Sequence, residues 1–270
     1  LQTEVRRRFS NGLYFQANYT LQKTLTDAPG IGQTRFDPLI DNANRGNEYA
    51  RWDADQQHVF NFNGIYELPF GKGRRFLNRG GVVDFFLGGW QLTSILQIAS
   101  GAPISITDPR GTLNRAGRSG RQTASSNLTN EQIADLIGIF HTPCGIYWIN
   151  PIAININHDA LNAGQCNNLS PLGANPDYFF QNAPGQTGNM ARNAWNGPLY
   201  LNWDASLMKN FRITENVRFQ VRGEVFNVLN RANFFVGVFP ASGNINSVNF
   251  GRVTSGFSPR IVQFAGRLEF

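Results

Sequence analysis

The sequence is poor in charged residues, in lysine and in cysteine, and it contains no long apolar run. Charged residues make up only 16% of the 270 residues, whereas a soluble domain carries about 25%. Every apolar run is shorter than the roughly 18 residues of a transmembrane helix, which excludes that class of membrane protein. Lysine occurs only at Lys23, Lys72 and Lys209, and the arginines are scattered. Because no helical face concentrates this positive charge, we expect no nucleic-acid partner.

Uncharged polarity and aromatic rings take the place of the missing charge. The chain has 31 Asn, 28 Gly and 22 Phe. The aromatic rings can bury enough apolar area to offset the entropy of the chain, which argues against disorder. It opens at Leu1 in the middle of a polar and apolar pattern, with neither an initiating Met nor a leader segment. We therefore expect the chain to be part of a longer protein.

Apolar and polar residues alternate with a period of two over several long segments. Successive side chains of a strand point to opposite faces, so each segment has one apolar and one polar face. The alternation predicts seven strands, over residues 1–9, 13–23, 58–70, 86–101, 199–212, 217–229 and 259–270. Their apolar faces are expected to form one exposed, lipid-facing band that includes Phe15, Tyr19, Phe62, Leu92, Leu201, Phe219 and Phe264.

A soluble β-sandwich and a membrane barrel both show such alternation, and three features favour the barrel. Several segments run beyond the 5–6 residues that are about average for soluble strands and reach the 9–11 residues, roughly, of a tilted transmembrane strand. The connections alternate between short and long, as periplasmic turns and outer loops do. The polar faces carry mid-strand charges, whereas the apolar faces there carry none; the charged residues expected to face a lumen are Asp204, Arg218, Arg222 and Glu224.

The predicted fold is therefore all-β: the wall of an antiparallel transmembrane β-barrel, with about seven strands of a larger barrel. Residues 1–270 form one barrel portion with short periplasmic turns. The long extracellular loops are residues 24–57, 102–198 and 230–258. The loops are rich in turn residues, with one short helix expected within 130–140, capped by Thr129. Such a wall contacts membrane lipid.

The two cysteines, Cys144 and Cys166, stand 22 positions apart in the longest loop. An outer loop lies in an oxidising environment, which favours a disulfide over the alternative of two unpaired thiols. His141 does not complete a zinc pattern with them, and we expect no metal there. Calcium remains an alternative in the acidic segment 37–55, whose carboxylates are Asp37, Asp41, Glu48, Asp53 and Asp55.

No catalytic constellation is present, and we expect neither an enzyme nor a cofactor. The basic turn 71–75 lacks the spacing and the helix of a phosphate loop; with Arg79 it supplies positive charge for contact with acidic lipid headgroups. Loop aromatics are candidate ligand contacts, with packing of the loops as the competing interpretation. These candidates are Trp52, Tyr147, Trp148, Tyr178 and Trp195.

Several motifs, taken in order, resemble those of TonB-dependent receptors, especially the Oar-like receptors of acidobacteria. The most specific are Asn-Trp-Asp-Ala-Ser-Leu-Met-Lys at 202–209 and Arg-Gly-Glu-Val-Phe-Asn-Val-Leu-Asn at 222–230. Further matches are 17–23, 89–103, 184–189 and the closing strand 260–270. The resemblance covers nearly the whole chain, least well over 102–183.

The resemblance implies the last seven strands of a 22-stranded barrel in the cell outer membrane. It makes Phe270 the terminal aromatic of a signature that the barrel assembly machinery recognises. The N-terminal plug and the box that contacts the TonB complex are absent from these residues. The implied function is energy-coupled import of a nutrient, such as a siderophore, oligosaccharide or peptide, bound at the outer loops. The alternatives are an Oar-like surface protein for adhesion or protein contact without transport, and a soluble all-β binding module.

Overall fold

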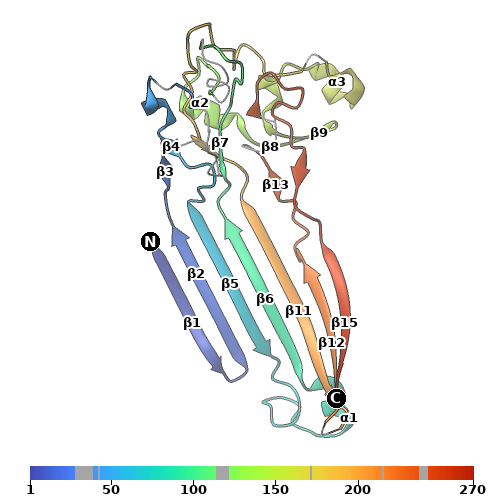
Figure 1. The fold of residues 1–270 in the computed structure, drawn as a ribbon. Coiled ribbons are helices and arrows are strands. Elements are labelled where there is room, and N and C mark those ends of the chain that lie inside the picture. Colours follow the sequence, from blue (N-terminus) through green and yellow to red (C-terminus); the bar gives the residue numbers. More distant parts are fainter. Residues whose placement is uncertain (28–38, 42, 114–121, 171, 215, 237–242) are drawn as a thin grey trace.

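Seven long strands form one antiparallel sheet (Figure 1). The computed structural model describes residues 1–27, 39–41, 43–113, 122–170, 172–214, 216–236 and 243–270. In spatial order, which is also chain order, the strands are β1 (Gln2–Ser10), β2 (Leu13–Leu21), β5 (His58–Glu67), β6 (Trp90–Ala99), β11 (Tyr200–Arg212), β12 (Arg218–Phe226) and β15 (Ile261–Glu269). The predicted strands and the all-β class are confirmed.

The sheet is open. Within the described residues, β1 pairs only with β2 and β15 only with β12, so these two strands are the edges. A sheet edge presents unpaired backbone N–H and C=O groups, which a bilayer core cannot satisfy.

Several strands are shorter than predicted. β5 ends at Glu67 because Pro69 has no N–H to donate to the ladder. β6 begins at Trp90 rather than at 86, because residues that continue the apolar pattern form the helix α1 (Val82–Leu87). β2 ends at Leu21, and β12 ends before Asn227, whose left-handed φ of 53° interrupts the extended backbone.

Register between strands separates an apolar face from a polar face. Across four neighbouring strands, one row of partners on the apolar face consists of Ala17, Phe62, Leu96 and Trp203. The next row, on the opposite face, consists of Asn18, Asn61, Gln97 and Asn202. The seven residues of the expected lipid-facing band all stand on the apolar face.

Exposure along this band differs from the expectation. Leu92, Phe219 and Phe264 are exposed, as predicted. Phe15, Tyr19, Phe62 and Leu201 are half-buried, because neighbouring side chains on the same face cover one another; the rings of Phe15 and Phe62, for example, stack with centroids 6.2 Å apart. The side chains of this face thus shield one another, and three of the seven remain exposed.

The connections gather at the two ends of the sheet (Figure 1). Turn 11–12, the described residues 213–214 and 216–217 of the β11–β12 turn, and the connection 68–89 lie at one end, the turn end. At the other end, the described parts of residues 22–57, 100–199 and 227–260 form what we call the loop layer. Its short elements are β3 (Leu25–Thr26), η1 (Arg45–Glu48), β4 (Ala50–Arg51), β7 (Pro103–Ile104), α2 (Asn130–Asp135), β8 (Ile137–Thr142), β9 (Gly145–Ile149), η2 (Pro151–Ala153), α3 (His158–Asn162), η3 (Cys166–Asn168), β10 (Trp195–Asn196), β13 (Phe234–Phe235) and β14 (Ser255–Gly256).

The short helix predicted within 130–140, with Thr129 as its cap, is present. α2 begins after Thr129, whose side chain accepts a hydrogen bond from the Gln132 N–H in a capping box. It ends at Asp135, because Ile137 already belongs to the hairpin of β8 and β9. Among the helices that the structure describes, none is long and apolar enough to cross a bilayer.

The hydrophobic core lies in the loop layer and not against the sheet, which the turn-rich loop sequence did not predict. The core takes residues from two of the three loops, and the rings of Phe179 and Phe250 meet edge to face at 5.9 Å. Its fully buried members include Ile104, Ile106, Ala124, Trp148, Ile149, Ala153, Ile154, Phe179 and Phe250. The loop layer is therefore a packed unit.

Asparagine side chains replace backbone pairing in this layer. The side-chain amide of Asn233 accepts from the N–H of Leu201 and donates to its C=O, at 3.0 and 2.9 Å. Asn189 pairs in the same way with both backbone groups of Ser126. Because irregular segments cannot satisfy each other's backbone groups through a ladder, these amides do so. This explains part of the high asparagine content.

Candidate ligand-binding site

A cavity of about 290 Å³ lies where the polar face of the sheet meets the loop layer. Gln97 of β6 and Tyr200 of β11 contribute to it from the polar face. The remaining lining comes from the loop layer and comprises Gln56, Ser100, Gly101, Ala102, Gly197, Pro198, Leu199, Asn233, Phe234, Phe235, Val236 and Phe257. We call it the junction cavity.

Aromatic rings form one side of the junction cavity. The rings of Tyr200 and Phe257 meet edge to face with centroids 5.0 Å apart, and Phe257 stacks on Phe235 at 4.7 Å. Tyr200 belongs to the sheet strand β11. Phe235 lies in β13, and Phe257 directly follows β14, the short strand that pairs with β13. Ring pairs of this kind fix one another's orientation.

Close contacts hold this corner in place. The N–H of Phe257 donates to the C=O of Asn233 at 2.9 Å, and Asn233 in turn pairs with the backbone of Leu201. At Gly101, a Cβ atom would stand 2.0 Å from the carbonyl oxygen of Gly197. Only glycine allows these two segments to approach so closely, so the cavity depends on that residue.

The junction cavity combines apolar rings with the amide groups of Gln56, Gln97 and Asn233. Ligand sites are typically concave, largely apolar and equipped with a few convergent polar groups. The arrangement suits a small ligand that has an apolar face to stack on rings and polar edges to bond amides.

A second cavity, of about 300 Å³, lies within the loop layer between residues 40–50 and 187–192. Arg192 reaches it but is engaged by two carboxylates: its guanidinium lies 3.2 Å from Glu48 and 3.1 Å from Asp53. At Gly188, a Cβ atom would stand 1.9 Å from the carbonyl oxygen of Thr123. This cavity therefore has a wall of closely packed backbone and a charge that is already balanced.

The same ion pairs bear on the calcium alternative. Glu48, Asp53 and Asp55 are buried against arginines, with Asp55 3.0 Å from Arg51, while Asp41 accepts from a backbone N–H two residues on. Asp37 lies outside the described residues. In the described ranges no group of three or more acidic, His or Cys side chains is arranged to hold a metal ion. The carboxylates of segment 37–55 that the structure describes thus serve ion pairs and turns.

Three of the five aromatic ligand candidates lie in the core of the loop layer. Trp148 is 1% exposed, Tyr147 3% and Trp195 8%, and the Trp195 indole donates to the C=O of Asn130 at 3.3 Å. Burial raises the pKa of the Tyr147 hydroxyl, opposed by the nearby Arg252. In this conformation these three side chains pack the loops, which was the competing interpretation. Trp52 and Tyr178 are half-buried.

The sequence alone does not single out the aromatic residues that line the junction cavity. Tyr200 lies within the predicted strand 199–212, and Phe234, Phe235 and Phe257 fall in loop sequence without a motif. The paired rings at 234–235, beside a strand that starts with Tyr200, were the available signal. This signal becomes informative only when the fold is known, because the fold brings residues 200 and 257 together.

The four predicted lumen charges all stand on the polar face. Arg222 lies 3.3 Å from Glu224 on its own strand, and Glu224 accepts from Gln263 of β15 at 2.8 Å. Asp204 accepts from Asn202 and from the backbone N–H of Asn227. Arg218 shares the face, two residues from Gln220 and four from Arg222. Their polar surroundings are those of a wetted surface.

The model of the outer membrane beta barrel domain matches residues 1–263. The chain belongs to this family. No curated protein and no solved structure matches it. The protein is accordingly a β-barrel protein of the cell outer membrane, and its open sheet contacts membrane lipid. This membership rules out the soluble β-module.

In this outer-membrane barrel protein, the apolar face is the one suited to lipid and the polar face to the lumen. Lys209 is an exception, because it stands on the apolar face, paired with Trp90 in register. Its ammonium donates to the C=O of Gly88 and lies over the rings of Trp90 and Phe211, at 5.5 and 4.7 Å from the centroids. The lysine is thereby covered by the turn end of the molecule.

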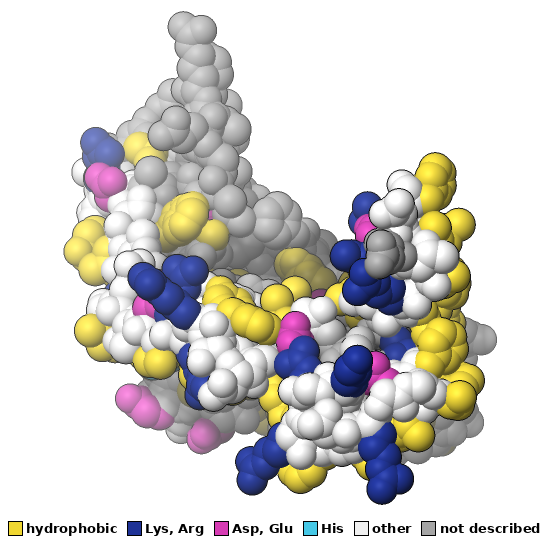
Figure 2. Space-filling view, turned by 90° about the horizontal axis from the view of Figure 1, so that it is seen from below, with side chains coloured by type: hydrophobic (Ala, Val, Ile, Leu, Met, Phe, Trp, Pro, Cys, Tyr) yellow, Lys and Arg dark blue, Asp and Glu magenta, His cyan; other side chains and the backbone are white. Residues whose placement is uncertain are grey.

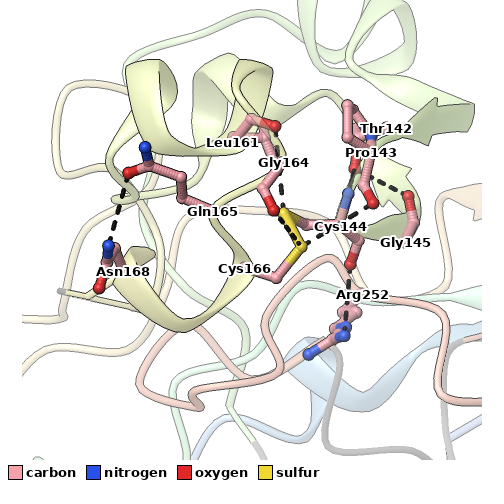
Figure 3. The surroundings of a disulfide bond; sticks show 10 residues. All are labelled: Thr142, Pro143, Cys144, Gly145, Leu161, Gly164, Gln165, Cys166, Asn168 and Arg252. Carbon is pink, nitrogen blue, oxygen red and sulfur yellow. Dashed lines mark hydrogen bonds between the residues drawn. A yellow bond between two sulfur atoms is a disulfide. The ribbon is translucent and has the colours of Figure 1, made fainter.

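Cys144 and Cys166 form the predicted disulfide, with Cα atoms 5.2 Å apart (Figure 3). Cys144 lies in the β8–β9 turn, where its N–H donates to the Thr142 hydroxyl at 3.2 Å and its C=O accepts from Arg252 at 3.4 Å. Cys166 begins η3. The bond ties the hairpin to the α3–η3 segment.

At the other end of the molecule, Phe270 follows β15 and is fully exposed.

Proposed function

We propose that this barrel protein is the C-terminal part of an Oar-like, TonB-dependent receptor that imports a nutrient. The observation that carries the proposal is the junction cavity, because it joins residues of the loop layer to Gln97 and Tyr200 on the polar face. A ligand bound there contacts both the loops and the wall of the lumen. Siderophores, oligosaccharides and peptides all combine the apolar faces and polar edges that its rings and amides suit.

The open sheet supports a larger barrel. In lipid, the edges β1 and β15 require partners, and the proposal assigns them further strands of a barrel with about 22 in all. The plug and the TonB-contacting box belong to the part of the receptor outside these residues. Residues 24–57, 102–198 and 230–258 are then extracellular loops. The lumen-facing charges Asp204, Arg218, Arg222 and Glu224 face the plug, and Phe270 is presented to the barrel assembly machinery.

Adhesion or protein contact without transport is a second candidate. The packed core of the loop layer favours it, because a preorganised surface loses little entropy when it binds a partner. A surface protein of this kind needs no cavity that reaches the polar face, and it needs no TonB complex.

The experiment uses the complete protein in the outer membrane of a host with and without TonB. Uptake of labelled siderophores, oligosaccharides and peptides is measured. We expect TonB-dependent uptake of one class, reduced at least tenfold by Tyr200→Ala or Phe257→Ala. Tyr14→Ala is the matched control, because Tyr14 stands on the polar face of β2 at the turn end, far from the cavity. Uptake should stay at the wild-type level in this variant.

Absence of uptake for all three classes, together with TonB-independent attachment to surfaces or proteins, would replace the transport proposal by adhesion. TonB-dependent uptake that is insensitive to both cavity variants would retain transport but remove the junction cavity as the binding site.

A further inference from the structure

The connection 68–89, between β5 and β6 at the turn end, exposes an unusual amount of apolar surface. Val82 is 74% exposed and Phe86 60%, and α1 buries none of its six residues. The exposed apolar side chains of the connection are Phe70, Phe76, Leu77, Val82, Val83, Phe85, Phe86 and Leu87. Exposed apolar side chains that are this concentrated in one connection mark a surface that contacts a partner or a membrane.

The connection is folded. The N–H of Gly71 donates to the C=O of Phe76 at 3.1 Å, and the Phe76 N–H donates back to Pro69 at 2.9 Å. The Asp84 carboxylate of α1 accepts from the N–H of Lys72 at 2.6 Å. The apolar side chains are therefore displayed by a defined backbone.

Three contacts fix α1 against the apolar face of the sheet. The ring of Phe85 lies 5.0 Å from that of Phe211. The Trp90 indole donates to the C=O of Phe86 at 2.9 Å, and Lys209 donates to the C=O of Gly88, just after the helix. Trp90, Lys209 and Phe211 all stand on the apolar face by register. The helix thus continues the surface that contacts lipid, and Figure 1 shows it at the turn end.

The same connection is basic. It holds Lys72, Arg74, Arg75 and Arg79 against the single carboxylate of Asp84. Arg74 pairs with Glu67 at 2.6 Å, and Arg75 lies over the ring of Phe76 at 5.4 Å from its centroid. Figure 2, which views the molecule from below, shows Lys and Arg side chains spread over this face of the molecule beside hydrophobic ones.

We propose that residues 68–89 form an interfacial anchor. The side chains of α1 insert into the lipid leaflet at the turn end, and the basic side chains bind the headgroups of anionic phospholipids. Continuity with the lipid-facing sheet selects lipid as the occupant, because a segment fixed to that face is already at the depth of the bilayer interface. Apolar side chains beside Lys and Arg are the combination by which surface helices bind anionic membranes.

The test places an environment-sensitive thiol label at position 82 of the complete protein by Val82→Cys, since both native cysteines are bonded. The protein is reconstituted into phosphatidylethanolamine vesicles with or without phosphatidylglycerol, and either lipid carries a nitroxide near its headgroup. We expect a blue-shifted emission that the nitroxide quenches, several-fold more strongly from phosphatidylglycerol. Glu131→Cys, on exposed α2 of the loop layer, carries the control label and should emit as in water.

Charge variants test the headgroup contact separately. Arg75→Gln combined with Arg79→Gln should abolish the preference for phosphatidylglycerol while quenching persists. Lys23→Gln combined with Arg45→Gln removes two exposed charges near the loop layer and should leave the preference unchanged. A heat-modifiable band on gels establishes that each variant has folded.

A label at position 82 that emits as in water, or that is shielded from every nitroxide lipid, would overturn the anchor. Shielding that depends on protein concentration, with energy transfer between labelled molecules, would identify a second copy as the occupant. Quenching with equal strength from both lipids in the wild-type sequence would overturn the binding of anionic headgroups.

Discussion

Arg192 joins two loops of the loop layer through a buried ion-pair cluster, and its removal should open that layer locally. Its side chain is 9% exposed and faces the carboxylates of Glu48 and Asp53, which are 0% and 8% exposed. Replacing it by Met keeps much of the volume and removes the cation that faces both. Breaking a buried pair from one side costs about 3–5 kcal/mol. The equilibrium constant for local opening should therefore rise about a hundredfold or more, since each 1.4 kcal/mol or so changes an equilibrium constant tenfold.

The measurement is hydrogen exchange of residues 43–53 and 187–193 in the folded protein, because exchange reports local opening. Arg45→Met is the matched control: Arg45 and Asp27 form a pair with side chains 65% and 61% exposed, and such pairs contribute little. Adding Glu48→Gln and Asp53→Asn to Arg192→Met should restore part of the protection. Unchanged exchange in Arg192→Met, or a triple variant as open as the single one, would refute the electrostatic explanation.

Three further predictions concern the wall, the disulfide and a buried carboxylate. Phe62→Arg, on the lipid-facing side of β5, should lower the free energy of unfolding from vesicles by about 2–4 kcal/mol. Asn63→Arg, on the polar face, should lower it by much less; equal losses would contradict the assignment of faces. Cys144→Ser with Cys166→Ser should destabilise the loop layer by about 3 kcal/mol, measured as faster proteolysis there, and reduction of the wild type should match it. Asp108 is buried, which raises its pKa, but bonds from Arg110, Asn182 and Asn246 outweigh this and hold the pKa below 3.8. The stability that this depressed pKa contributes is present above about pH 4 and is lost as the pH falls through the folded-state value. The protection of residues 106–108 from hydrogen exchange, relative to the intrinsic exchange rate at each pH, should therefore fall below pH 4 in the wild type, and this fall should disappear in Asp108→Asn.

The sheet could be predicted from sequence because its signal is local. Nine or more alternating residues determine which face a residue takes, and chain neighbours pair in order. The boundaries could not be predicted where an apolar sequence continues past the strand. Val82–Leu87 has the composition of a strand but forms a helix. The Asp84 carboxylate accepts from the N–H of Lys72, and the Asp84 C=O accepts from the N–H of Gly88, and these bonds hold the segment in a helical turn.

Long-range partners account for what the sequence did not reveal. Lys209 stands on a face where no charge was expected, and its partners at Gly88, Trp90 and Phe211 become visible only in the folded sheet. The loop layer escaped prediction for the same reason. Its core is assembled from elements of two to six residues, too short for any period to appear, and its cavity lining unites residues 200 and 257 across a long stretch of chain.

The composition of the loop-layer core sets the order of events during assembly. Ile104 and Ile149 precede β11 in the chain, whereas Ile245 and Phe250 follow β12. The core therefore closes only when segments from both sides of the β11–β12 hairpin have come together. Until then the apolar side chains of the earlier segments lack part of their cover. The disulfide, whose two cysteines lie within one loop, can form during that interval. It then reduces the conformational entropy that this loop loses when the core closes.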